Sequence, residues 1–241
     1  MSHLISVAMI TMNEEKAVAR VMEDIRRALH GREYEIVIVD SSRDATPDIA
    51  AGEGARVIRQ FPPQGYGYAM ARVLQESHGD VVVTLDCDGT YPAGEIPRLA
   101  DMVLSGQCDV VNASRLERRP SAMPLANYLG NWLFAFAGRV LVGVASTDVH
   151  SGMRAYSRRV IQEVEVDPHG PALPVDLLLK PVLQGFHLRE VFIPYSERIG
   201  QTTLRRWSST IWTFRRILRL ASSRWSQAPK RNLTKNTSLA D

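Results

Sequence analysis

Short runs of apolar residues alternate with segments of helical periodicity over the first half of the chain. The apolar runs lack the strict in-and-out alternation of a half-exposed sheet, so the pattern predicts strands that are buried on both faces. Between them, apolar residues recur three and four positions apart, as on one face of a helix. The expected strands are residues 4–11, 34–39, 55–58, 80–85 and 109–113, and the expected helices are residues 14–29, 46–53, 67–77 and 96–105.

Strands that alternate with helices predict an α/β fold with a mostly parallel, Rossmann-like sheet flanked by helices. In such sheets, ligands bind beyond the carboxyl ends of the strands. Polar residues follow three of these strands: Asn13 and Glu14 after the first, Asp40 after the second, and Asp86 and Asp88 after the fourth. We therefore expect a ligand site at this edge of the sheet.

The strongest amphipathic pattern lies near the C-terminus, in residues 204–226. Apolar residues follow three- and four-residue spacing there, with arginines between them. Such a helix can lie in the headgroup region of a membrane, or it can cover the sheet with its apolar stripe, and both interpretations stay open. We expect one domain over residues 1–203, this basic helical segment, and a flexible tail over residues 227–241.

The most apolar stretch, residues 128–146, contains Asn131, Arg139 and three glycines, so it predicts an amphipathic or core helix and not a transmembrane span. No signal-peptide pattern opens the chain, and its two cysteines, Cys87 and Cys108, form no C-x-x-C pair. These features favour a cytoplasmic protein. If the basic helix binds lipid, attachment is peripheral, on the cytoplasmic face of the membrane.

Charge is unevenly distributed along the 241 residues, whose net charge is +3. Residues 201–241 carry nine Lys or Arg residues and one acid, whereas the remainder is acidic. This asymmetry indicates an anionic partner, which is a membrane surface, a phosphate or a nucleic acid. A nucleic-acid-binding protein is the remote alternative, because it leaves the acidic residues at the strand ends unexplained.

Two carboxylates stand one residue apart in the triplet Asp86-Cys87-Asp88, directly after a strand of almost unbroken valine and leucine. Mg²⁺ and Mn²⁺ prefer oxygen ligands, and often bind one or two carboxylates together with substrate phosphates. The triplet therefore predicts a metal that neutralises a diphosphate leaving group. A solvated turn is the alternative, but the position after a buried strand favours the metal.

Two further segments carry candidate chemistry. Asp40, at the end of the second strand, is expected to hydrogen-bond a nucleotide base or ribose. Asp148 and Arg154 flank a glycine turn, where Arg154 is expected to hold a phosphate. A structural pair between Asp148 and Arg154 is the alternative.

These segments, in this order, resemble the family 2 glycosyltransferases of GT-A fold, and particularly the dolichyl- and polyprenyl-phosphate sugar synthases. The likeness runs from about Val7 to Leu204, which is most of the chain. No single segment decides it, but their shared order is specific. The segments that carry it are residues 10–15, 40–46, 65–69, 77–80, 86–92, 114–115, 148–156, 175–179 and 198–202.

The resemblance implies a metal-dependent, inverting glycosyltransferase with a UDP- or GDP-linked sugar donor. It implies a polyprenyl- or dolichyl-phosphate acceptor, and the alternative is a soluble small-molecule acceptor. A lipid phosphate is already ionised near neutral pH. An alcohol acceptor instead needs a general base, for which Asp148 and Asp176 are the candidates.

The resemblance also assigns roles to individual residues. Mg²⁺ or Mn²⁺ is expected at Asp88, together with the diphosphate and Asp86. The residues expected in catalysis are Asp88, Asp148, Arg154 and Asp176. Those expected to bind the nucleotide or donor sugar are Thr11, Asn13, Glu14, Asp40, Asp86, Ser114 and Arg115. Those expected to face the acceptor or its phosphate are Arg198, Arg205 and Arg206.

Overall fold

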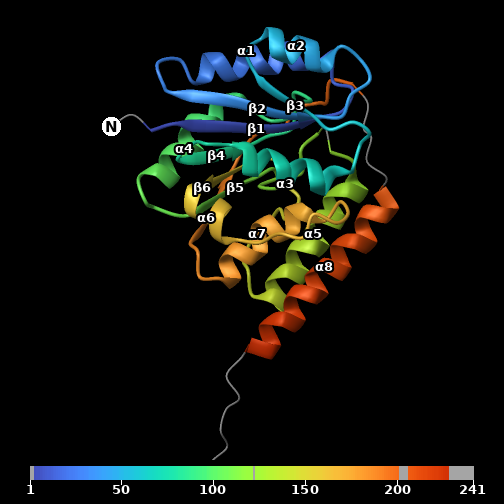
Figure 1. The fold of residues 1–241 in the computed structure, drawn as a ribbon. Coiled ribbons are helices and arrows are strands. Elements are labelled where there is room, and N and C mark those ends of the chain that lie inside the picture. The colour runs from blue at the N-terminus through green and yellow to red at the C-terminus, as the bar shows by residue number, and fades with distance from the viewer. Residues whose placement is uncertain (1–2, 122, 201–205, 228–241) are drawn as a thin grey trace, which may run out of the picture.

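A seven-stranded sheet forms the centre of the protein, with the strand order β3-β2-β1-β4-β6-β5-β7 (Figure 1). The computed structural model describes residues 3–121, 123–200 and 206–227. The strands are β1 (Ile5–Thr11), β2 (Tyr34–Asp40), β3 (Arg56–Arg59), β4 (Val81–Thr84), β5 (Val110–Ser114), β6 (Arg154–Ser157) and β7 (Leu188–Phe192). All five strands expected from the sequence are present.

The sheet is parallel except at β6, which runs antiparallel to both of its neighbours, β4 and β5. The prediction of a mostly parallel sheet is therefore confirmed. Because β6 runs the other way, its first residue lies at the carboxyl end of β4, where Arg154 is opposite Thr84. The loop before β6, residues 148–153, is thereby brought to the edge where ligands bind in parallel sheets.

Helices cover both faces of the sheet. Side chains of α1 (Val18–Ala28), α2 (Thr46–Gly52) and α4 (Ile96–Leu104) share one apolar core with one face. Side chains of α3 (Tyr66–Glu76), α6 (Arg158–Glu163) and α7 (Leu173–Leu183) share a second core with the other face. A short 3₁₀ helix, η1 (Ala93–Glu95), precedes α4. Burial on both faces explains why the strands read as continuous apolar runs.

A further helical layer packs against α7, and Figure 1 shows α8 (Arg206–Gln227) running diagonally alongside it. The layer contains α5 (Leu125–Ala137), the π-helix η2 (Gly138–Val142) and α8. Ile217, Leu220 and Ala221 of α8 are buried in an apolar cluster with α5, η2 and α7. The prediction of a helix over residues 204–226 is close to the observed bounds. Part of the apolar stripe therefore packs against helices instead of covering the sheet, while Ile211 and Leu218 of the same helix are exposed.

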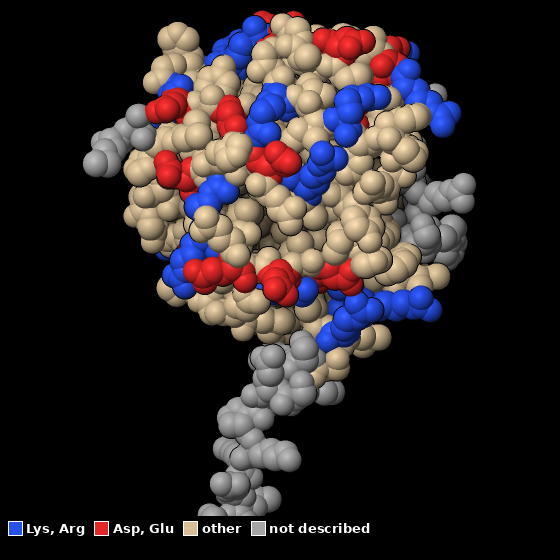
Figure 2. Space-filling view, in the orientation of Figure 1, with Lys and Arg blue, Asp and Glu red and all other residues tan. Residues whose placement is uncertain are grey.

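Lys, Arg, Asp and Glu side chains are interspersed on the face drawn in Figure 2, so neither sign dominates it. The helices in the described part of the chain are all too short or too polar to cross a membrane.

Candidate active site

Side chains from several strand ends meet at one edge of the sheet. Thr11 and Asp40 are direct partners at the ends of β1 and β2. Asp86 and Asp88 follow β4, the neighbour of β1 on its other side, and Ser114 ends β5. The structure therefore brings together the strand ends that the sequence singled out, and the loop before β6 joins them.

Asp40 ties the first two loops of this edge together. Its buried carboxylate accepts hydrogen bonds from the hydroxyls of Thr11 and Ser42, both at 2.6 Å. Arg59 donates to its other oxygen. Because donors from the protein already reach both oxygens, Asp40 fixes the shape of the loop after β2.

The loop after β1 is held against this scaffold. Asn13 adopts a positive φ of 62°, and its backbone amide donates a hydrogen bond to the Ser42 hydroxyl at 2.8 Å. The Arg43 amide donates to the Asn13 side chain at 2.9 Å, and the Glu14 amide donates to Thr46 at 2.9 Å. Burial, together with nearby carboxylates, raises the pKa of Glu14 to about 7, although Arg198 opposes the shift. Glu14 thus faces the same charges as the acidic triplet.

The acidic triplet forms the centre of the site. Asp88 is buried, and one of its oxygens accepts from the Thr90 amide at 3.0 Å and the Thr90 hydroxyl at 2.6 Å. Its other oxygen accepts from Arg198, whose Nε lies at 2.7 Å. Arg198, which we expected at the acceptor phosphate, is therefore paired with Asp88, which we expected to bind the metal.

Asp86 lies near this ion pair and feels the charges of both Asp88 and Arg198. Burial and the neighbouring charge of Asp88 raise the pKa of Asp86 to about 6, while Arg115 and Arg198 partly offset both effects. Gly152 leaves room for it, because a Cβ on that residue would lie 2.6 Å from Asp86 Oδ2. A carboxylate crowded by a like charge gains from an added cation.

The donor set fits Mg²⁺ or Mn²⁺. The described residues include no group of three or more His, Cys, Asp or Glu side chains arranged to hold a metal. A protein that supplies only two carboxylates leaves the remaining positions to water and phosphate, as Mg²⁺ sites commonly do. Asp86 and Asp88 are thus suited to an ion that arrives with a diphosphate.

Arg115 and Asp148 form a buried, bidentate ion pair next to the acidic triplet. Arg115 donates through Nε at 2.7 Å and Nη2 at 2.9 Å, and Asp148 is fully buried. Burial raises the pKa of Asp148, but the Arg115 charge and hydrogen bonds outweigh it and leave the pKa below its usual value. The Arg115 guanidinium also lies over the rings of Tyr91 and Tyr195. A carboxylate held this way is a weak base.

Arg154 is a scaffold residue in this structure. Its guanidinium is buried, and its three nitrogens donate to Asn112 Oδ1 and to the carbonyls of Pro174 and Val149. The expected phosphate contact is contradicted by this arrangement, because each nitrogen is already used inside the core. The alternative pair with Asp148 is also wrong, since Asp148 pairs with Arg115.

Asp176 does not join the other candidates. It lies on α7, fully buried, and accepts from Arg216 at 2.6 Å; Lys180 lies 3.1 Å away. It therefore anchors α8 to α7 instead of facing the strand ends. Of the two remaining phosphate candidates, Arg205 lies outside the described residues. Arg206 begins α8, and its side chain is likewise outside them.

Sequence reasoning missed several residues that shape the site. Ser114 shares a hydrogen bond with Thr147 at 2.6 Å, and Glu190 on β7 accepts from the Thr147 hydroxyl at 2.7 Å. The Tyr91 hydroxyl accepts from the Gly152 amide at 2.7 Å. Tyr91 lies three residues after Asp88, so its position in the sequence could have indicated a place in the site. Glu190 lies in an ordinary strand pattern that carried none.

A Rossmann-like sheet with two carboxylates after a central strand is the arrangement of a GT-A glycosyltransferase. The chain belongs to glycosyl transferase family 2, whose family model matches residues 6–165. It is therefore a glycosyltransferase, as the sequence predicted.

Two curated relatives come from Haloferax volcanii. The chain is 42% identical over 200 residues to a dolichyl-phosphate hexose transferase, which covers 83% of this chain and 86% of that protein. It is 36% identical over 205 residues to the low-salt glycan biosynthesis hexosyltransferase Agl6, where it spans 49% of that protein and 83% of its own length. The chain thus spans about half the length of the second relative.

A solved structure with the same fold is glucosyl-3-phosphoglycerate synthase from Mycobacterium tuberculosis, in complex with Mn²⁺, UDP-glucose and phosphoglyceric acid. Its TM-score is 0.73 at 21% identity, over 91% of this chain and 80% of that one. The likeness confirms the GT-A fold.

Proposed function

We propose that this enzyme transfers a hexose from a UDP- or GDP-linked donor to a polyprenyl- or dolichyl-phosphate acceptor, with inversion at the anomeric carbon. The observation that carries the proposal is the cluster at the end of β4. There the charges of Arg115 and Arg198 act on Asp86, and Arg198 forms an ion pair with Asp88. Paired carboxylates and cations at one strand end suit a metal-bound diphosphate.

Asp86 and Asp88 would hold the Mg²⁺ or Mn²⁺ ion, which supplies charge neutralisation for the departing diphosphate. Thr11, Asn13, Glu14 and the loop after Asp40 would form the nucleotide pocket. Arg198 would move its charge from Asp88 toward the phosphates as the donor binds.

A phosphate acceptor fits the finding that both candidate bases are paired with an arginine. Asp148 is held by Arg115, and Asp176 is buried against Arg216. A hydroxyl acceptor needs a proton acceptor within hydrogen-bond reach, whereas a phosphate monoester needs little help. The name of the Haloferax dolichyl-phosphate hexose transferase supports the same acceptor class.

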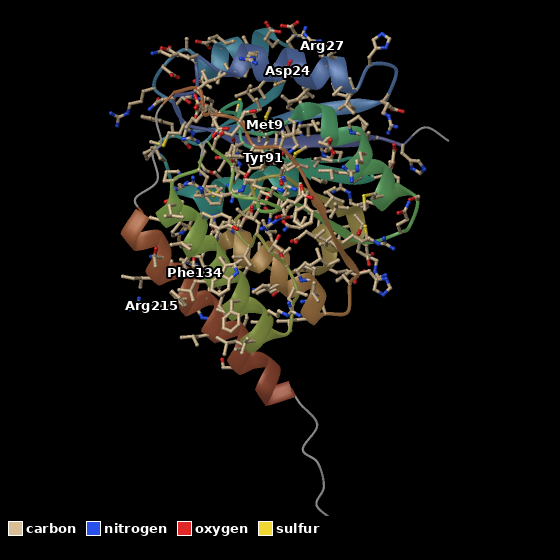
Figure 3. All side chains as sticks on the ribbon, turned by 180° about the vertical axis from the view of Figure 1, so that it is seen from behind. Met9, Asp24, Arg27, Tyr91, Phe134 and Arg215 are labelled. Carbon is tan, nitrogen blue, oxygen red and sulfur yellow. The ribbon has the colours of Figure 1, made fainter. Side chains whose placement is uncertain are left out.

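The test is transfer of labelled hexose from UDP- and GDP-linked donors to a short polyprenyl phosphate, with and without Mn²⁺. We expect organic-soluble product from one donor, and a loss of about hundredfold or more in Asp88→Asn and Asp86→Asn. Asp24→Asn is the matched control, because Asp24 lies on the surface of α1 (Figure 3). Equal turnover in all three variants contradicts the assigned site.

A soluble phosphorylated acceptor is the second candidate, because the solved structure with this fold binds phosphoglyceric acid. It requires the same donor site. Assays that replace the polyprenyl phosphate with phosphoglyceric acid separate the two, and transfer to the soluble acid alone overturns the lipid proposal.

A further inference from the structure

A stripe of large apolar side chains lies exposed along α5 and η2. Its members recur three and four positions apart, so they share one helix face. Each is between 45% and 60% exposed, whereas the opposite face of α5 packs into the body through Phe134 and Ala137. The stripe consists of Leu125, Leu129, Trp132, Leu133, Phe136 and Val140.

One part of this stripe borders a groove of about 270 Å³. Trp132 and Phe136, whose rings stack with centroids 5.8 Å apart, line it from α5. Leu116 and Thr147 line it from the loops that follow β5 and precede β6. The volume is just under the range of drug-sized pockets, which suits a short segment of a chain.

The groove lies beside the candidate active site. Leu116 directly follows Arg115, and Thr147 bonds to Ser114 at 2.6 Å. Leu116 and Thr147, which line the loop side of the groove, are therefore neighbours of residues at the carboxyl end of β5. A ligand in the groove would therefore lie next to the carboxyl end of β5.

The groove is mainly apolar, although the polar side chains of Tyr128, Arg139, Ser146 and Thr147 also line it. Glu190 accepts hydrogen bonds from the hydroxyls of Ser146 and Thr147, at 2.6 Å and 2.7 Å. These polar atoms are thus satisfied inside the protein and leave carbon surface for a ligand. Residues 118–147 contain no acid and three arginines, at 118, 119 and 139. An anionic, apolar molecule complements this combination.

We propose that the groove binds the first isoprenoid units of the lipid-phosphate acceptor, with the phosphate toward Ser114 and Arg115. The proposal rests on the proposed function and adds the site that binds the lipid chain of the acceptor. A prenyl phosphate joins a charged head to a branched apolar chain. The protein presents cationic residues at one end of the groove and aromatic rings along it.

The experiment compares dimethylallyl, geranyl and farnesyl phosphates as acceptors of the wild-type enzyme. We expect kcat/KM to rise by roughly tenfold or more once the chain is long enough to enter the groove, because apolar surface is then buried. The donor KM should stay constant across the series.

Trp132→Ser and Phe136→Ser test the groove itself, and Val140→Ser is the matched control. Val140 belongs to the same exposed stripe but does not line the groove. The two groove variants should raise the KM for farnesyl phosphate about tenfold and leave the donor KM and the melting temperature unchanged. Val140→Ser should match the wild type.

Each other outcome contradicts the proposal in a distinguishable way. Equal losses in all three variants, together with weaker sedimentation on anionic phospholipid vesicles, assign the stripe to a bilayer surface. Loss of a dimer in analytical ultracentrifugation assigns it to a second copy of the chain. If kcat/KM does not depend on the length of the prenyl chain, the groove does not bind the acceptor, but the proposed function is still supported. Failure with every prenyl phosphate removes both.

Discussion

Arg198 grips the carboxylate of Asp88 through two nitrogens, Nε at 2.7 Å and Nη2 at 2.5 Å. The guanidinium thereby occupies the oxygen of Asp88 that Thr90 leaves open. A divalent ion at the triplet and this arginine compete for the same negative charge. Before a donor arrives, Arg198 thus supplies a positive charge beside the two carboxylates, and this charge partly offsets the raised pKa of Asp86.

Replacing Arg198 by alanine should therefore have opposite effects on two measurements. Without nucleotide, the affinity for Mn²⁺ should rise about tenfold, since a charged hydrogen bond that competes with the metal is gone. Sugar transfer should fall by a similar or larger factor, because a cation near the diphosphate is lost. Titration calorimetry with MnCl₂ and the transfer assay check the two effects. Arg98→Ala removes an exposed arginine on α4 as the control.

Gly152 should tolerate no side chain. A Cβ there would come within 2.9 Å of both carboxylate oxygens of Asp86. The Gly152→Ala substitution must therefore displace the Asp86 carboxylate, which is a proposed metal ligand. We expect transfer to fall at least tenfold while the far-ultraviolet spectrum stays native. Gly94→Ala is the control, because its Cβ would meet nothing within 4 Å. Full activity in Gly152→Ala would show that Asp86 is free to move.

The ion pair of Arg115 and Asp148 should matter for stability as well as for activity. Asp148→Ala leaves a guanidinium that is only 10% exposed without its carboxylate, which typically costs about 3–5 kcal/mol. Urea denaturation of Asp148→Ala and of the double variant Arg115→Met/Asp148→Leu checks this. The double variant should recover part of the loss, because no buried charge is left unpaired. Equal losses in both variants contradict the explanation.

The sequence predicted the five strands that alternate with helices, because each is a buried apolar run. It did not predict β6 or β7. Arg154–Ser157 is four residues long and opens with an arginine, so it has no strand pattern of its own. Its place between β4 and β5 comes from pairing with partners that are more than 40 residues away in the chain.

The same limit applies to the site. The acidic triplet was predictable because its chemistry and its position after a strand are both local features. The partners of Asp148 and Asp176 were not, because Arg115 and Arg216 lie 33 and 40 residues away. Arg154 was misassigned for the same reason: an arginine near a glycine turn resembles a phosphate ligand until its buried acceptors are known.

Arg216 should fasten α8 to the body of the protein. Its guanidinium is 2% exposed and bonds to Asp176 at 2.6 Å and to the backbone carbonyls of Asp167 and His169. Arg216→Ala should destabilise the protein by about 3–5 kcal/mol and speed amide hydrogen exchange in α8. Arg219→Ala, which removes a largely exposed pair with Asp167, should cost under about 1 kcal/mol. Similar values for the two variants would contradict the assignment.

His150 should make the protein less stable in mild acid. Burial lowers its pKa from 6.5 to about 4, and only Nε2 has a hydrogen-bond partner, Thr213, among the described residues. The folded state therefore keeps the imidazole neutral, while the unfolded chain takes up a proton below its ordinary pKa. As the pH falls from 6.5 to 4, folding should lose about 3 kcal/mol at this residue, and about 2 kcal/mol of this by pH 5.

Urea denaturation of the wild type and His150→Gln at pH 7 and pH 5 isolates this contribution from the carboxylates, which titrate in both proteins. The variant should lose about 2 kcal/mol less than the wild type between the two pH values. His30→Gln removes an exposed histidine and should follow the wild-type curve. If the wild type and His150→Gln lose equal stability, His150 is protonated in the folded state, and the cluster around Phe134 must open to admit water.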